Sequence, residues 1–369
     1  MKKLSILTTP AVALGVGILC APSVLAAGYT LNQTNLDTAA GAAGTETGGI
    51  LCDNGLGLYG GSGCALSEGD WTQEGNIDLT AVEVGGTPIE GLSLQNNVNI
   101  SNPDNGTITG NISVTAEEVT LNDLNVAGNV TIQNGDADVT INGGSYTGEG
   151  YGAALNINNV NTATFNNAAF SAGGASAAYI NGGDITINSG SFTSTGDNGI
   201  ELSGANSLKI SGGTFTGAAA GITFGYSPAA GTVSLTGGTF TGTGTNGKAI
   251  YNYTNSDSTL ISGLVASGYH FTNSTVTSES GMGGGAYIAG TTKVLADGQS
   301  ESGENQTTNP TSTSTTTTTK KSGIGAPDTG AFTAEEGSAT SSSSILTVMA
   351  TVLVALTGAI LVKKHSKRA

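Results

Sequence analysis

The segment VTINGGSYTG at residues 139–148 decides the fold, because the chain repeats it. It returns as ATFNNAAFSA at 163–172, ITINSGSFTS at 185–194, LKISGGTFTG at 208–217 and VSLTGGTFTG at 233–242. The aromatic residue keeps its place in every copy, and successive aromatic residues are 22 to 25 residues apart. A fixed period of this size indicates stacked structural repeats, in which each repeat buries its apolar side against its neighbours.

Each period contains three short runs of alternating apolar and polar residues. In one period these runs are 185–188, 191–193 and 199–202. Alternation places every second side chain on the same side of an extended strand. Three strands per period, each with its apolar side inward, predict an all-β fold. We expect a parallel β-helix solenoid of about nine coils over residues 76–296, with each strand about 4.8 Å from its counterpart in the next coil.

A hydrogen-bonding residue stands before the turn that follows the first run of a period. These residues are Asn122, Asn142, Asn166, Asn188, Ser211 and Thr236. Stacked at one turn, such side chains can bond to one another and to the backbone. In its periodicity and in this ladder, the chain over about residues 76–290 resembles the right-handed β-helix family typified by pectate lyases. That family carries asparagine ladders and internal aromatic stacks, so the resemblance implies a right-handed coil.

The charge of the chain limits its partners and its chemistry. Residues 27–344 contain all 27 carboxylates and only five lysines, which gives this part a formal charge of −22. Such a surface repels nucleic acid. The family that the chain resembles uses a basic residue, usually arginine, for its lyase reaction. The only arginine here is Arg368, so we do not expect lyase activity. We expect no cofactor, and no metal site, because His270 has no histidine partner in the exported part.

The N-terminal residues indicate export. Residues 1–26 begin with basic residues, continue with an apolar run and end in small residues, as a secretory signal peptide does. Residues 27–75 are irregular and rich in glycine, and we expect them to form a cap that protects the first coil. In an exported chain, Cys52 and Cys64 are expected to form one disulfide.

The C-terminal residues indicate attachment to a cell surface. Residues 297–344 are dominated by serine and threonine and predict a disordered stalk. Residues 345–362 form an apolar run of 18 residues, which is long enough for one transmembrane helix. The basic tail at 363–369 is expected on the cytoplasmic side of the membrane, which leaves the solenoid outside the cell.

A short motif lies between the stalk and the apolar run. Its residues are Ala326, Pro327, Asp328, Thr329 and Gly330. The motif, the apolar run and the basic tail together resemble the sortase cell-wall sorting signal of Gram-positive surface proteins, whose pattern is Leu-Pro-x-Thr-Gly. The resemblance implies that a sortase attacks the Thr329 carbonyl and links the chain to the cell wall. Ala326 replaces the leucine of the pattern, and anchoring by the membrane helix alone is the alternative.

The third strand of each period sends one column of side chains outward. The column contains Asn156, Tyr179, Glu201, Thr223 and Tyr251. Exposed tyrosines beside small polar groups can stack on sugar rings and hydrogen bond through their hydroxyls. Tyr179, Glu201 and Tyr251 are therefore the candidate binding residues.

These features predict a binding protein rather than an enzyme. We expect a surface-anchored adhesin or glycan-binding protein, whose partner is a glycan or a cell-surface protein. One alternative is a polysaccharide hydrolase, which needs facing carboxylates; Asp184, Asp197 and Glu201 are the candidates. A second alternative is a passive coat or spacer protein.

Overall fold

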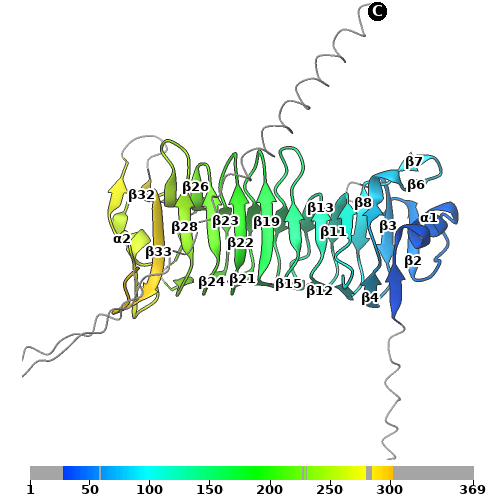
Figure 1. Cartoon of the computed structure of the whole chain (residues 1–369), viewed down its shortest axis with the longest axis horizontal. Coiled ribbons are helices and arrows are strands. Elements are labelled where there is room, and N and C mark those ends of the chain that lie inside the picture. Colours follow the sequence, from blue (N-terminus) through cyan, green and yellow to red (C-terminus); the bar gives the residue numbers. More distant parts are fainter. Residues whose placement is uncertain (1–27, 58–59, 227, 230, 280–284, 302–369) are drawn as a thin grey trace, which may run out of the picture. The chain divides into compact units, whose positions relative to one another are not determined.

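The chain folds as a parallel β-solenoid. The computed structural model describes residues 28–57, 60–226, 228–229, 231–279 and 285–301. Within these ranges the chain winds through about seven turns (Figure 1). The predicted all-β solenoid is confirmed, whereas the prediction of nine coils was too high.

Each turn contributes one strand to each of three sheets. Sheet 1 contains, in order, β1 (Tyr29–Leu31), β4 (Gly69–Gln73), β9 (Val98–Ser101), β12 (Glu118–Asn122), β15 (Asp138–Asn142), β18 (Thr162–Asn166), β21 (Asp184–Ile187), β24 (Ser207–Ile210) and β27 (Val233–Leu235). Sheet 2 contains β5 (Ile77–Asp78), β10 (Thr107–Thr109), β13 (Asn125–Ala127), β16 (Ser145–Thr147), β19 (Ala168–Ala172), β22 (Gly190–Ser194), β25 (Thr214–Gly217), β28 (Thr239–Gly242), β33 (Thr291–Ala296) and β30 (Tyr269–Phe271).

Sheet 3 carries the outward column singled out above. Its strands are β2 (Ile50–Asn54), β3 (Ser62–Leu66), β8 (Gly91–Leu94), β11 (Asn111–Val114), β14 (Val130–Ile132), β17 (Leu155–Asn158), β20 (Ala178–Asn181), β23 (Ile200–Gly204), β26 (Ala220–Phe224), β29 (Lys248–Asn252), β32 (Ala286–Ala289) and β31 (Val276–Ser278). From β9 to β29 the three sheets alternate strictly along the chain, and neighbouring turns pair in parallel.

The core is a column of inward side chains stacked by this pairing. In sheet 2 the aromatic residues of five consecutive turns lie in register, and all are buried. Their ring centroids are 4.8 to 5.3 Å apart and their planes are within 20° of parallel. These residues are Tyr146, Phe170, Phe192, Phe215 and Phe240. The strand spacing of a parallel sheet therefore sets the ring spacing of the stack.

A ladder of asparagine side chains runs along the turn after sheet 1. The Asn142 Nδ2 donates to Asn122 Oδ1 at 2.9 Å, and the Asn166 Nδ2 donates to Asn142 Oδ1 at 2.8 Å. Asn188 extends the ladder by donating to Asn166 Oδ1 at 2.8 Å. Ser211 follows, with its Oγ 3.4 Å from Asn188 Oδ1. The predicted ladder thus forms over these five turns.

In three turns, at Asp123, Gly143 and Asn167, the residue after the ladder position takes a left-handed backbone conformation. Gly143 has φ +68°, and the equivalent Asn167 has φ +56°. Asparagine tolerates this region better than other residues with a side chain, which explains how the 163–172 period dispenses with glycine there. At Gly144 (φ +82°) a Cβ atom would collide with the carbonyl oxygen of Leu124 in the previous turn. In this period, glycine is therefore favoured at 143 by the left-handed backbone and at 144 by the close contact with the previous turn.

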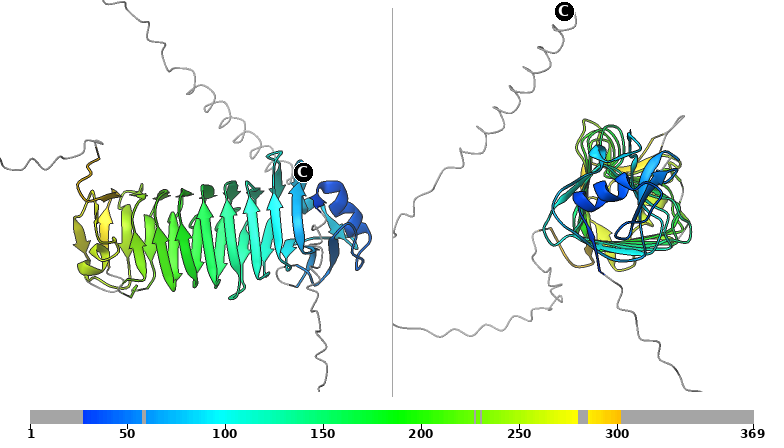
Figure 2. Two further views of the ribbon diagram at one scale, coloured as in Figure 1. Left: turned by 90° about the horizontal axis from the view of Figure 1, so that it is seen from below. Right: turned by 90° about the vertical axis from the view of Figure 1, so that its right-hand side faces the viewer.

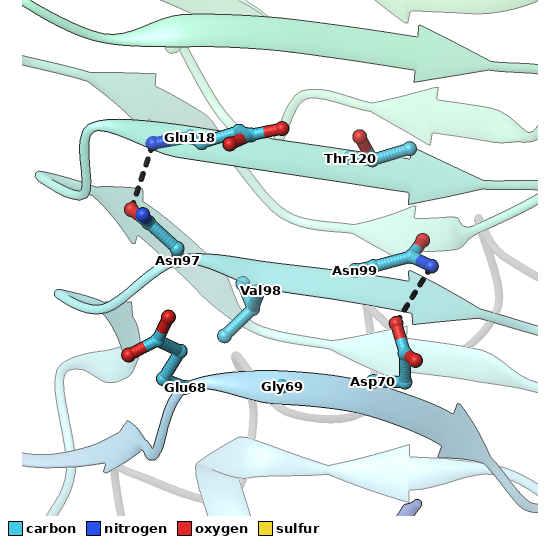
Figure 3. A pocket seen from close by; sticks show the side chains of 8 residues that line it. All are labelled: Glu68, Gly69, Asp70, Asn97, Val98, Asn99, Glu118 and Thr120. Atoms are coloured by element: carbon cyan, nitrogen blue, oxygen red, sulfur yellow. Dashed lines mark hydrogen bonds between the residues drawn. The ribbon is translucent and has the colours of Figure 1, made fainter. Parts of the chain in front are cut away.

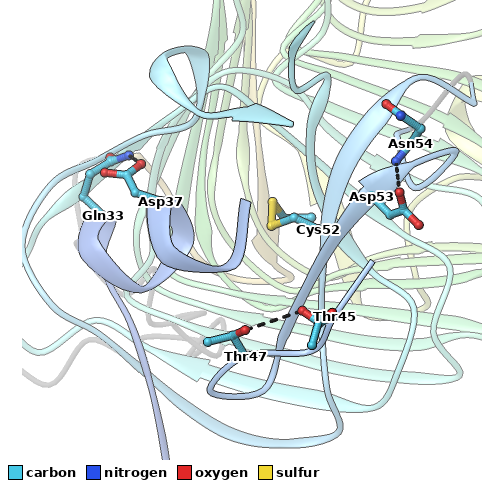
Figure 4. Close-up of a disulfide and its surroundings, with 8 residues drawn as sticks. Gln33, Asp37, Thr45, Thr47, Cys52, Asp53 and Asn54 are labelled. Carbon is cyan, nitrogen blue, oxygen red and sulfur yellow. Dashed lines mark hydrogen bonds between the residues drawn. A yellow bond between two sulfur atoms is a disulfide. The ribbon is translucent and has the colours of Figure 1, made fainter. Parts of the chain in front are cut away.

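The N-terminal end of the solenoid is covered by helix α1 (Gln33–Gly41), which lies across it (Figure 2). Next to α1, β2 and β3 pair antiparallel, and Cys52 and Cys64 form a disulfide between them (Figure 4). Further along, the 3₁₀ helix η1 (Leu79–Ala81) and the hairpin of β6 (Glu83–Val84) and β7 (Thr87–Pro88) interrupt the strand pattern. Their presence is one reason why the complete turns begin later than predicted.

The C-terminal end closes in a different way. β33 pairs antiparallel with β28, and β32 pairs antiparallel with β29, so the last turn receives reversed strands. Residues 259–261, which fall within the predicted solenoid, form part of helix α2 (Ser258–Ser262). Asp257 caps this helix, because its Oδ1 accepts a hydrogen bond from the Thr259 backbone N–H at 2.9 Å. That capping interaction favours a helical turn over a strand.

Several predicted segments lie outside the described residues. They are the signal peptide at 1–26, the motif at 326–330, the membrane helix at 345–362 and the tail at 363–369, together with most of the stalk. In the part of the chain that the structure describes, no helix is long and apolar enough to span a membrane.

Candidate functional site

The outward face of sheet 3 carries a column of polar and aromatic side chains. Strand pairing places Tyr179 beside Asn156 on one side and beside Glu201 on the other. The next two strands add Thr223 and Tyr251 in the same register. The structure therefore aligns the three candidate binding residues along one line. Because neighbouring strands are about 4.8 Å apart, the line offers an extended ligand a regularly repeated contact.

A groove of about 640 Å³ opens over β23, β26 and β29. We call it the sheet-3 groove, and its lining includes Asp197, Glu201, Thr223, Lys248, Tyr251 and Tyr253. Glu201 and Tyr251, two of the three candidate residues, thus share one hollow. Tyr179 lies one strand away from Glu201, and its hydroxyl donates to Ser203 Oγ at 2.7 Å.

Asp197 and Glu201 converge on one buried hydroxyl group beside this groove, that of Ser176. The Ser176 Oγ lies 2.9 Å from Asp197 Oδ2 and 3.2 Å from Glu201 Oε2. A serine hydroxyl has one proton to donate, so it satisfies only one of the two carboxylates at a time. Burial raises the pKa of the Glu201 carboxyl, and the negative charge of Asp197 raises it further, while the Ser176 hydrogen bond lowers it.

A buried asparagine holds this pair in position. The Asn198 Nδ2 donates to Asp197 Oδ1 at 2.9 Å and to Ser176 Oγ at 3.3 Å. Its Oδ1 accepts a hydrogen bond from Thr223 Oγ1 at 2.7 Å. Ser176 and Asn198 lie in the connections before β20 and β23, which vary between periods. Sequence analysis missed both residues, because no periodic pattern marks them.

Among the described residues that line the groove there is one lysine, Lys248, which lies two strands away on β29. The Lys248 Nζ is 3.9 Å from the centroid of the Tyr251 ring and 5.0 Å from that of Tyr287. It also lies 4.0 Å from Glu279 Oε2. These cation–π and ion-pair contacts hold the ammonium group beside Tyr251. The groove therefore has an acidic end and a basic end, and the basic end was not foreseen because Tyr287 arrives on an antiparallel strand.

The three carboxylates considered for hydrolysis, Asp184, Asp197 and Glu201, do not lie together in the structure. Asp184 begins β21 in sheet 1, where its Oδ1 accepts a hydrogen bond from Ser207 Oγ at 2.9 Å. Asp197 and Glu201 belong to the groove over sheet 3. Although all three residues fall within one turn of the solenoid, the turn directs Asp184 to another side of the prism. Only Asp197 and Glu201 come together.

A smaller cavity of about 180 Å³ opens on sheet 1, and sequence analysis did not single it out (Figure 3). Glu68, Asp70 and Glu118 contribute its carboxylates. The Asn99 Nδ2 donates to Asp70 Oδ1 at 3.0 Å, and Asn97 Oδ1 accepts from the Glu118 backbone N–H at 2.9 Å. Among the described residues, no three or more histidine, cysteine or acidic side chains are grouped to hold a metal ion. We assign this cavity no ligand.

Comparison with protein-family models found no match to this chain, and comparison with curated proteins and with solved structures found none either. The resemblances to pectate lyases and to sortase substrates therefore depend on the sequence patterns described above.

Proposed function

We propose that this protein is displayed on a cell surface and binds a glycan in the sheet-3 groove, as an adhesin or another glycan-binding surface protein. The observation that carries the proposal is the joint presence of tyrosines and carboxylates in one open groove, aligned with the strand spacing. Sugar rings stack on aromatic side chains, and sugar hydroxyls donate to carboxylates. A linear glycan would follow the column from Tyr179 to Tyr251.

The sequence ends supply the display that this role requires. The signal-like residues 1–26 support export, and the stalk at 297–344 supports a solenoid held away from the cell. The sorting-like motif at 326–330 and the apolar run at 345–362 support attachment by a sortase or by the membrane helix. The likeness to right-handed β-helix proteins, many of which act on polysaccharides, agrees with a glycan ligand.

Removing a tyrosine of the column should weaken glycan binding. The exported part, residues 27–344, would be applied to a glycan array, and the affinity for the best glycan measured by calorimetry. Tyr179→Ala and Tyr251→Ala are expected to lower that affinity about tenfold each, which equals ~1.4 kcal/mol. Thr193→Ala, on the outward face of sheet 2, is the control and should change nothing. Unchanged affinity in both tyrosine variants would show that the column is not the binding site.

A second candidate function is polysaccharide hydrolysis. The favouring observation is the Asp197–Glu201 pair, in which one carboxyl has a raised pKa, as the general acid of a glycosidase has. The same exported fragment, incubated with the glycan that it binds, would release reducing ends if it were a hydrolase. Loss of that release in Glu201→Gln would support catalysis. If the fragment neither binds nor cleaves any glycan, the result would support the alternative of a passive coat or spacer protein.

A further inference from the structure

The carboxylate pair of the sheet-3 groove has no cationic partner in the part of the chain that the structure describes. Among the described residues neither Asp197 nor Glu201 forms an ion pair, and the lysine of the groove is engaged elsewhere. Lys248 contacts Glu279 and the rings of Tyr251 and Tyr287 instead. The two carboxylates thus face one hydroxyl in a half-buried position, and no positively charged group among the described residues pairs with them.

A second observation concerns hydrogen-bond acceptors in the same column. The Asn156 Oδ1, two strands from Glu201, is buried and has no hydrogen-bond partner among the described residues. Asn156 does not line the groove, whose acidic end is formed by the carboxylates of Asp197 and Glu201, while its one lysine among the described residues, Lys248, lies beside Tyr251. A ligand at the acidic end of the groove can donate to the two carboxylates, which favour positively charged donors.

We infer that the sheet-3 groove selects a glycan whose sugars carry a protonated amino group, with one ammonium seated between Asp197 and Glu201. The inference depends on the proposed function, and it adds the chemical class of the sugar. An ammonium has three protons and can donate to both carboxylates and to Ser176 Oγ at once, which the serine hydroxyl cannot do. The sugar rings extend from that point toward Tyr251 and Tyr253, the aromatic residues of the groove.

The rest of the chain supports a cationic polymer over an anionic one. The described residues include three lysines, Lys209, Lys248 and Lys293, and no arginine, so an acidic polysaccharide meets repulsion over most of the surface. An amino-sugar polymer meets attraction along the same surface, which also raises its rate of association.

Two oligosaccharides of the same length and linkage test the inference. One consists of glucosamine units and the other of N-acetylglucosamine units, so they differ in charge at the amino nitrogen. Binding of each to the exported fragment would be measured by calorimetry at mildly acidic pH, where the free amines are protonated. We expect the charged oligosaccharide to bind at least tenfold more tightly. Asp197→Asn and Glu201→Gln should each remove most of this difference, because the loss of a negative charge weakens the binding of the charged oligosaccharide more than that of the acetylated one.

Asp184→Asn is the matched control. Asp184 belongs to the same turn and also accepts a serine hydroxyl, but it lies on sheet 1. Its replacement should leave the preference intact. If the two oligosaccharides bind equally, the inference is wrong and the glycan-binding proposal survives. If neither binds, the proposed function itself fails. An oligolysine that binds as tightly as the glucosamine chain would overturn the inference in favour of a basic peptide.

Discussion

At the scale of single residues, Tyr146 is the one member of the aromatic stack that carries a hydroxyl group. Phe170, Phe192, Phe215 and Phe240 occupy the equivalent positions in the following turns. The Tyr146 side chain is fully buried, and its hydroxyl has no hydrogen-bond partner within the described part of the chain. Burial raises the pKa of this hydroxyl, and the nearby charge of Asp123 raises it further. A buried polar atom without a partner lowers stability.

Replacing this tyrosine should therefore stabilise the protein. Tyr146→Phe removes the unpaired hydroxyl and keeps the ring stacked on Phe170, so we expect the free energy of unfolding to rise by about 1 kcal/mol. Urea denaturation followed by circular dichroism measures the change. The reverse substitution one turn later, Phe170→Tyr, is the matched control and should be destabilising. A loss of stability in Tyr146→Phe would mean that a buried water or another group satisfies the hydroxyl.

At the scale of elements, the asparagine ladder links successive strands of sheet 1 through their side chains. Every amide in it donates toward the previous turn, from Asn188 through Asn166, Asn142 and Asn122. The series continues to Asn99, whose Nδ2 donates to the Asp70 carboxylate at 3.0 Å. The amide dipoles thus point the same way, and a negative charge meets the N–H end of the series. Aligned hydrogen bonds of this kind strengthen one another.

An interior position of the ladder should be more sensitive than its end. Asn166→Ala leaves Asn142 Oδ1 without its donor and Asn188 Nδ2 without its acceptor, so we expect a loss of about 2 kcal/mol. Ser211→Ala removes one long contact at the end of the ladder and should cost about 0.5 kcal/mol. Chemical denaturation of both variants provides the comparison. Equal losses would show that the ladder does not act as a connected unit.

At the scale of the whole solenoid, stability depends on how its ends are covered. Stacked repeats contact only their neighbours, so an end turn offers unpaired backbone groups to other chains. At the N-terminal end, α1 and the disulfide hairpin of β2 and β3 cover it, and buried Trp71 stacks on Tyr29 with 4.6 Å between the ring centroids. At the C-terminal end the antiparallel strands β32 and β33 complete the last turn.

Breaking the disulfide should weaken the N-terminal cap first. Cys52 and Cys64 are 12 residues apart in sequence, and a closed loop of this size contributes about 3 kcal/mol by restricting the unfolded chain. The double variant Cys52→Ser, Cys64→Ser should lose that stability and aggregate more readily, as thermal melting and light scattering would measure. The native protein in a reducing agent is the control and should behave like the variant. A variant that melts at the native temperature would show that α1 alone secures the cap.

The repeat made the solenoid predictable, because each strand pairs with the equivalent strand one period away in the sequence. The positions of Phe192 and Asn166 follow from a period that any two neighbouring copies reveal, and strand alternation decides which side chains point inward. Where the period fails, prediction failed as well. Residues 259–261 lack the repeat and form part of a helix, which the Asp257 cap stabilises. The count of coils was too high for the same reason.

The amino-acid sequence by itself determined the sheets, the aromatic stack, the ladder and the alignment of Tyr179, Glu201 and Tyr251, since each depends on residues that recur at a fixed spacing. Tertiary structure alone decided the chemistry of the groove. Ser176 reaches Asp197 and Glu201 from the neighbouring turn, through a connection that follows no period. The Lys248 contacts with Glu279 and Tyr287 come from the reversed strands that close the solenoid. Contacts of this kind depend on the path of non-repeating connections and of the closing antiparallel strands, which a repeating sequence pattern does not specify.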